Sequence, residues 1–148
     1  MTPTPQRGAA QAPGFSMIEI VVTLAIVAIL AALALPHYQE ALRRGRRADA
    51  RAGLLQAAHW LERRATRTGS YLHDQADFPE GLKSVPSGSY VIGFEASPTP
   101  GSGYTLTATP RGAQVGDRCG SYTLDQTGLR GLASASATEA LQAECWNR

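Results

Sequence analysis

The sequence lacks the residue patterns of most catalytic and metal sites. Its two cysteines are not arranged as Cys-x-x-Cys, and no Cys/His cluster suggests zinc ligands. His37, His59 and His73 are scattered, without carboxylate or Cys partners at ligand spacing. No Ser/His/Asp set and no pair of acids stands out, and the glycines of residues 101–103 lack the helix start that a phosphate loop needs. We therefore expect a protein that is not an enzyme and has no cofactor or metal.

Polar residues are almost missing from one part of the chain. Between residues 20 and 35 the only polar side chain is Thr23. A helix over the 21 residues 15–35 would be about 31 Å long, which is the thickness of the hydrocarbon layer of a bilayer. Because this helix is apolar on all sides, it is suited to burial in lipid or in a helical bundle. We predict a transmembrane helix over residues 15–35.

Charge of one sign dominates the segment that follows. Residues 37–67 contain eight Arg against three acids, whereas residues 68–148 contain five basic side chains against eight acidic ones. Apolar residues in this segment recur at spacings of three, four or seven, which predicts an amphipathic stem helix over residues 36–67. Pro36 removes one backbone donor, so we expect a kink there. The basic stem and acidic head could attract each other between subunits, or both could be solvated faces.

The remaining residues, 68–148, have the signals of a small globular head. Residues 70–88 carry mixed Gly and Pro signals and are expected to form a long ordered loop. Alternating or β-branched stretches bounded by Gly or Pro predict strands at 89–96, 104–109 and 120–125. The last segment, rich in Ala and Ser, is expected to be irregular. The fold class is thus α+β, with a long N-terminal helix packed on a small antiparallel sheet.

Cys119 and Cys145 are the candidates for a disulfide. A pair of cysteines downstream of an export segment favours an oxidising compartment. In the chain-entropy model the bridge would stabilise the head by about 3–4 kcal/mol. Two buried free thiols are the alternative.

The chemistry of the apolar segment depends on Glu19. Residues 1–14 contain three Pro and two Gly, which is typical of a flexible leader. Residues 15–35 could be a plain anchor, a secretory signal cut after Ala34, or an anchor whose leader is removed on its N-terminal side. A carboxylate is costly in an apolar helix. Cleavage after Gly14 would place a cationic amine on Phe15, four residues from Glu19, and only this interpretation gives the acid a partner.

Residues 14–20 (GFSMIEI), followed by an apolar helix and Pro36, resemble the prepilin signature of type IV pilins. The resemblance implies that a prepilin peptidase cuts after Gly14 and that Phe15 is then N-methylated. It also implies that Glu19 is the acid required for docking a subunit into the fibre, and that Pro36 is the helix-kinking proline of the family.

Downstream, residues 43–50 (RRGRRADA), residues 119–125 (CGSYTLD) and Cys145-Trp146 are similar to PilE-like minor pilins of Gram-negative bacteria. The resemblance implies a structural subunit of a type IV pilus that serves pilus biogenesis, motility or adhesion. Its partners would be other pilin subunits, the prepilin peptidase and the assembly machinery. It would lie in the inner membrane with its head in the periplasm before assembly, and in the extracellular fibre afterwards.

Three alternatives stay open. A pseudopilin of a type II secretion system shares the N-terminal signature, but its head more often uses a calcium site than a terminal disulfide. A periplasmic protein released after Ala34 would belong to another class. A DNA-uptake role would need exposed basic residues on the head, and the excess of acids there argues against nucleic acid as a partner.

Overall fold

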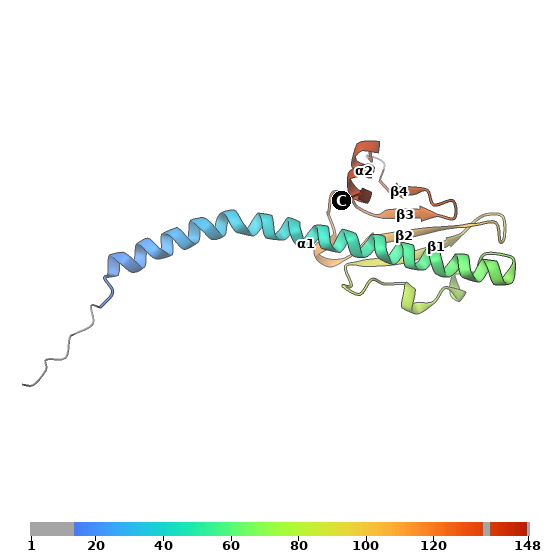
Figure 1. Ribbon diagram of the computed structural model, residues 1–148, viewed down its shortest axis with the longest axis horizontal. Helices are drawn as coiled ribbons and strands as arrows, with labels where there is room; N and C mark the ends of the chain where they lie inside the picture. The colour runs from blue at the N-terminus through green and yellow to red at the C-terminus, as the bar shows by residue number, and fades with distance from the viewer. Residues whose placement is uncertain (1–13, 135–136, 148) are drawn as a thin grey trace, which may run out of the picture. The chain divides into compact units, whose positions relative to one another are not determined.

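A computed structural model describes residues 14–134 and 137–147. The chain divides into two compact units, Met1–Tyr38 and Gln39–Arg148, and the helix α1 (Met17–Thr68) begins in the first and ends in the second (Figure 1). Residues 1–13, which make up most of the predicted leader, lie outside the described part of the chain.

The described part of the first unit is almost entirely the start of α1. The carbonyl oxygen of Ser16 accepts hydrogen bonds from the backbone N–H groups of Glu19 and Ile20, at 3.0 and 3.3 Å. All residues from 14 to 38 are exposed. One 18-residue window of the helix has a mean hydropathy of 2.8 with none of it buried, so α1 is long and apolar enough to cross a membrane. The helix continues through Pro36 without interruption.

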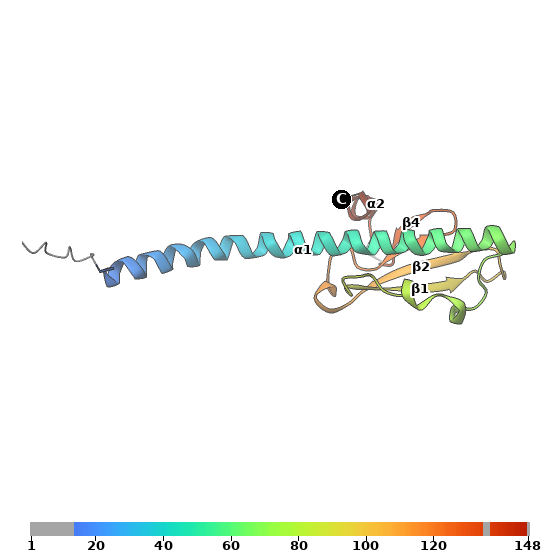
Figure 2. The same ribbon diagram turned by 60° about the horizontal axis from the view of Figure 1, so that its bottom comes forward.

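The second unit is built on a four-stranded antiparallel sheet in the order β1-β2-β3-β4. Each strand pairs with its neighbour in sequence, and the part of α1 that belongs to this unit lies across one face of the sheet (Figures 1 and 2). The strands are β1 (Tyr90–Ala96), β2 (Tyr104–Pro110), β3 (Tyr122–Asp125) and β4 (Arg130–Leu132).

The core of this unit forms between α1 and the sheet. Alternation along β1, β2 and β3 buries every second side chain, and these side chains include four aromatic rings. They meet a stripe on α1 with the helical spacing of three and four residues, formed by Ala50, Leu54, Ala57 and Leu61. Gly53 lets the helix approach closely, because a Cβ there would lie 2.7 Å from Ile92 Cδ1 and 2.9 Å from Val85 Cγ1.

The loop after α1 contains two short 3-10 turns, η1 (Gln75–Asp77) and η2 (Glu80–Leu82). Asp74 caps η1 through a hydrogen bond that its Oδ1 accepts from the N–H of Ala76 at 2.8 Å. Leu72, Phe78 and Val85 point into the core, so the expectation of an ordered loop is confirmed.

The expectation of an irregular last segment was wrong. The segment holds β4 and the helix α2 (Glu139–Asn147). Thr138 precedes α2, and its Oγ1 accepts a hydrogen bond from the N–H of Leu141 at 3.2 Å. The strand β4 was missed because three residues are too few to show alternation. The helix was missed because the Ala and Ser that surround it are weak signals.

Candidate functional site

The residues of the predicted processing and docking site lie at the start of the described chain. Gly14 and Phe15 precede α1, and Phe15 is 79% exposed. Glu19 lies in the first turn of α1, where a negative charge is favourable beside the unpaired N–H groups of the helix. The structure therefore leaves both the Gly14–Phe15 peptide bond and the Glu19 carboxylate accessible, and their roles remain predictions.

The apolar surface that follows has no cover within the described chain. Every Ile, Val and Leu from residue 18 to residue 35 is exposed, with fractions from 47% for Ile20 to 72% for Ile18. A patch of this size is not stable in water and marks a surface for lipid or for other protein chains. Pro36 lies inside α1 just beyond this surface, and the kink expected there remains a prediction.

In the head, Arg47 connects the stem helix to the loop before β3. Its Nε and Nη2 donate to the two carboxylate oxygens of Asp117, at 2.9 and 2.5 Å, and its Nη1 donates to Glu40 at 3.0 Å. Arg47 and Asp117 are both buried. Asp117 also accepts a hydrogen bond from the N–H of Cys119 at 3.0 Å, so the same carboxylate holds one end of the disulfide.

The charges of this buried pair are coupled. Burial by itself raises the pKa of Asp117, but hydrogen bonds from Arg47 and from the Cys119 N–H outweigh it, and the pKa of Asp117 falls below its ordinary value. The hydrogen bond to Asp117 raises the pKa of Arg47 and outweighs its desolvation. Both groups are therefore ionised wherever the head is folded at neutral pH.

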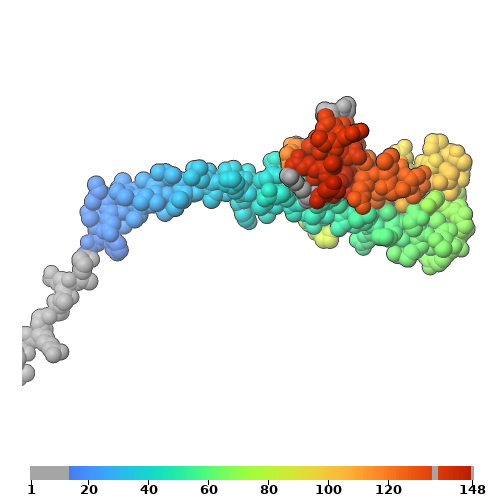
Figure 3. All heavy atoms as spheres, turned by 45° about the horizontal axis from the view of Figure 1, so that its top comes forward, coloured from blue at the N-terminus to red at the C-terminus, as the bar shows by residue number. Residues whose placement is uncertain are grey.

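The disulfide closes the C-terminal region onto the sheet. Cys119 and Cys145 are bonded, with their Cα atoms 5.8 Å apart, and both are buried. Arg51 of the stem donates to the carbonyl oxygens of Cys145 and Trp146, at 3.1 and 2.8 Å. Trp146 packs edge-on against Tyr122 and donates to Gly131 O at 3.0 Å. Trp146 is thus buried in the head, and Figure 3 shows α2 beside the stem residues of the head.

At the other end of the head, Glu62 joins the helix to two tyrosines. The hydroxyls of Tyr71 and Tyr104 donate to Glu62 at 2.9 to 3.1 Å. Burial, together with the hydrogen bond to Glu62, raises the pKa of Tyr104. This end also carries Arg63, Arg64 and Arg67, and residues 63–73 contain no acid. The only side-chain charges on this stretch are therefore positive at neutral pH.

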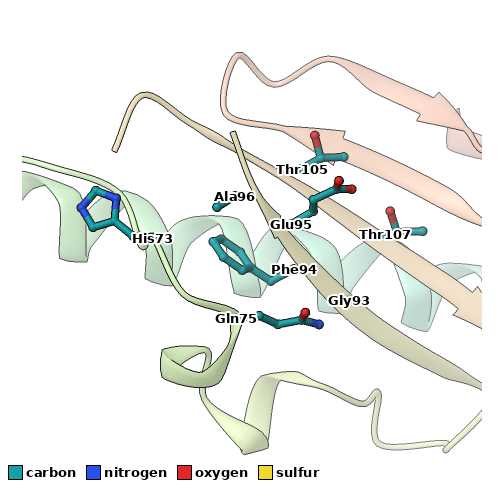
Figure 4. A pocket seen from close by; sticks show the side chains of 8 residues that line it. All are labelled: His73, Gln75, Gly93, Phe94, Glu95, Ala96, Thr105 and Thr107. Carbon is teal, nitrogen blue, oxygen red and sulfur yellow. The ribbon is translucent and has the colours of Figure 1, made fainter. Parts of the chain in front are cut away.

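One open depression of about 470 Å³ lies on the face of the sheet opposite α1 (Figure 4). Residues from β1, β2 and the loop after α1 line it, and its acidic side chain is Glu95. His73 is the one lining residue that could carry a positive charge. Because phosphate groups need several cations, this depression is not suited to nucleic acid. In the described part of the chain, no group of three His, Cys, Asp or Glu residues could hold a metal ion.

Comparison with known families identifies this arrangement. The model of the family described as Type IV minor pilin ComP, DNA uptake sequence receptor, matches residues 36–123. The chain belongs to this family of type IV minor pilins. The model of the prokaryotic N-terminal methylation motif matches residues 11–35, which include Gly14, Phe15 and Glu19.

Two solved structures resemble this minor pilin. A type IV pilin from Shewanella oneidensis is 30% identical with a TM-score of 0.50, over 66% of this chain and 99% of that one. The non-core minor pilin PilV of Neisseria meningitidis is 20% identical with a TM-score of 0.50, over 66% of this chain and 92% of that one, which supports the fold alone. The expected α+β pilin fold is confirmed, and the family is one of structural subunits.

Membership in this family implies that this minor pilin assembles with other pilin subunits and is processed by a prepilin peptidase. The methylation motif and the apolar start of α1 fit a membrane-anchored pilin that later becomes part of a pilus.

Sequence reasoning missed the residues that hold the head together, Arg47, Arg51 and Asp117. The only local signal was a charged residue on the buried face of the stem, at Arg47, three residues before Ala50. A buried arginine needs an acid as its ion-pair partner. Residues 68–148 contain eight acids, and the sequence does not show which of them pairs with Arg47.

Proposed function

We propose that this minor pilin is cut between Gly14 and Phe15, methylated on Phe15 and held in the inner membrane by residues 15–35 with its head in the periplasm. It is then moved into an extracellular pilus fibre. The observation that carries this proposal is the uncovered apolar start of α1, which contains a single carboxylate, Glu19, four residues after Phe15.

The physical argument concerns what covers this surface. Burying one Leu, Ile or Val side chain away from water contributes about 1.5–3 kcal/mol, so the segment is stable in lipid and again in a fibre core. Because both environments are apolar, the net gain on transfer is small, and extraction requires work from the assembly machinery. The contacts between successive subunits do not close, so they generate an open helical fibre.

Glu19 acts in this scheme as a register device. A carboxylate in an apolar core is strongly disfavoured unless a positive charge lies beside it. The new amine of Phe15, in the same or a neighbouring subunit, supplies that charge. The carboxylate meets this amine at only one position of the subunit along the fibre axis, and this contact therefore selects the register of docking.

The test compares Glu19→Ala with Glu139→Ala, which changes the first-turn glutamate of α2 on the head surface. We expect both variants to be cleaved. Glu19→Ala should be lost from sheared fibres, and Glu139→Ala should be incorporated as the wild type is. Normal incorporation of fully cleaved Glu19→Ala would refute the register role.

A second candidate function is DNA capture. The matching family is described as a DNA uptake sequence receptor. Although the head has an excess of acids, the stretch from residue 63 to residue 73 carries Arg63, Arg64 and Arg67 and no acid. Arg63 and Arg67 are exposed and Arg64 is half-buried. Three guanidinium groups at one end of the head fit contacts to successive phosphates of DNA, which position the duplex without reading its sequence.

DNA capture is tested by gel retardation at two salt concentrations. The variant Arg63→Gln/Arg64→Gln/Arg67→Gln should lose the retarded band, and the wild-type band should weaken as salt rises. The control Arg43→Gln/Arg44→Gln/Arg46→Gln removes the same number of charges from the other end of the head. Equal losses in the two triple variants would show that general charge, and not this surface, binds the DNA.

A further inference from the structure

We propose that the end of the head where Gln39 lies binds the headgroup of an anionic phospholipid while the subunit is anchored in the membrane. The site is a depression of about 290 Å³ lined by Gln39, Leu42, Arg43, Arg46 and Ala113. This inference rests on the proposed membrane anchoring of residues 15–35.

The first support is the charge of the lining. Arg43 and Arg46 both line the depression, and no acid does. Of the nearby acids, Glu40 accepts from Arg47, and buried Asp117 forms its ion pair with Arg47 and interacts with Arg43 only through its charge. Asp49 lies three residues after Arg46, but no ion pair joins the two side chains among the described residues. The depression therefore holds two arginines that form no ion pair with an acid among the described residues.

The second support is how the depression is built. The stem at Arg43 lies beside Gln114, whose Nε2 is 3.5 Å from the Arg43 carbonyl oxygen, at the limit of a hydrogen bond. Gln114 is buried and also donates to the Tyr90 hydroxyl at 3.2 Å, so the segment that carries Ala113 is held against the stem. Arg43 and Arg46 are half-buried, and both line the hollow together with Gln39, which lies four and seven residues before them on the same helix.

The third support is the short length of chain between this hollow and the apolar segment. Gln39 follows Leu35 by four residues and Arg46 follows it by eleven. In a helix this is about 6–17 Å of path along the chain, which places the hollow within reach of lipid headgroups. Leu42, which is 40% exposed, adds an apolar contact beside the two cations. A headgroup with a net negative charge fits this lining, and a zwitterionic one brings its own cation into conflict with the arginines.

The test uses the full processed chain in detergent, with bound lipids counted by native mass spectrometry. Phosphatidylglycerol and phosphatidylcholine are added in equal amounts. We expect the wild type to retain phosphatidylglycerol preferentially, and Arg43→Gln/Arg46→Gln to bind it about thirtyfold more weakly, as expected for two lost arginine–headgroup contacts. The control Arg63→Gln/Arg67→Gln removes the same charge and should keep the preference.

Failure of this proposal and failure of membrane anchoring have different signatures. If residues 15–35 do not anchor the subunit, the wild type will be missing from the membrane fraction. If the subunit is in that fraction but binds both lipids equally, or if the two double variants lose the preference equally, the headgroup site does not exist. The headgroup proposal would also be overturned if Arg43→Gln/Arg46→Gln lost DNA retardation but kept the lipid preference. The two arginines would then bind nucleic acid and not lipid. A circular dichroism spectrum like that of the wild type establishes that each variant is folded.

Discussion

The apolar start of α1 and the head solve the problem of hydrophobic surface in opposite ways. In the described head, Leu54 and Leu106 are fully buried, whereas in the segment before it Leu30 and Leu33 are 61% and 64% exposed. Leucine side chains therefore stabilise the fold of the head, whereas in the apolar start of α1 they are not covered by any other part of the described chain. This chain therefore folds one region by itself and covers the apolar surface of the other only with lipid or with further subunits.

The contrast follows from the pattern of residues and not from their hydrophobicity alone. Strands β1 and β2 alternate, so one face of the sheet is apolar and α1 covers it. Residues 18–35 are apolar all round, and no single neighbour could cover every side of that helix. All buried residues of the described chain are at or after Arg47, so a fragment from Gln39 contains the complete core.

The strongest test of the contrast is a pair of identical substitutions in α1. Leu54→Ala should lower the free energy of unfolding of the head by about 3–5 kcal/mol, because it leaves a cavity in a closed core. Leu30→Ala should change it by less than about 0.5 kcal/mol. Both are measured on the full chain in mild detergent by tryptophan fluorescence, since Trp60 and Trp146 lie in the head. Equal effects would show that the two regions are not independent.

Breaking the buried ion pair should have a similar effect. Asp117→Ala leaves Arg47 charged and without its principal partner, and we expect a loss of about 3–5 kcal/mol in urea unfolding of the Gln39 fragment. Glu95→Ala, at an exposed acid, is the control and should stay within about 0.5 kcal/mol. A small loss at Asp117 would mean that the ion pair contributes little.

The same pair predicts how stability depends on pH. Since the folded head lowers the pKa of Asp117, its contribution is complete above the unfolded pKa of about 3.9 and is lost as pH falls through the still lower folded value. Wild-type stability should therefore decline below about pH 4, and the gap to Asp117→Ala should narrow there. If the difference in unfolding free energy between the wild type and Asp117→Ala stays constant down to strongly acidic pH, the ion pair of Asp117 is not its source.

Removing the disulfide should have the next largest effect. The bridge spans 26 residues, and Cys119→Ser/Cys145→Ser should cost about 3–4 kcal/mol in the chain-entropy model. The measurement is thermal unfolding of the Gln39 fragment with and without reductant. Reductant should destabilise the wild type and leave the double variant unchanged.

The smallest effects concern two glycines of α1. Gly53→Ala should destabilise the head by about 1–3 kcal/mol, because its Cβ would collide with Ile92 and Val85. Gly45→Ala has nothing within 4 Å of the new Cβ and should stabilise the helix by up to about 1 kcal/mol. Both are compared by urea unfolding. Similar gains at both positions would show that the contact at Gly53 is loose.

The sequence predicted the elements whose signals are local and repeated. The long helix follows from an apolar run joined to an amphipathic one, and β1, β2 and β3 follow from alternation bounded by Gly or Pro. It could not predict which face of the stem packs on the sheet, because alanines occur on both faces: Ala50 is buried and Ala52 is exposed. The Arg47–Asp117 pair joins residues 70 positions apart, and no local pattern records such a contact.

The most direct measurement is the intact mass of the mature subunit recovered from purified fibres. We expect a chain that begins at Phe15, carries one added methyl group and lacks the two hydrogens released when Cys119 and Cys145 bond. A mature chain that begins at any other residue would remove the amine that Glu19 requires, and would contradict the proposed anchoring and docking.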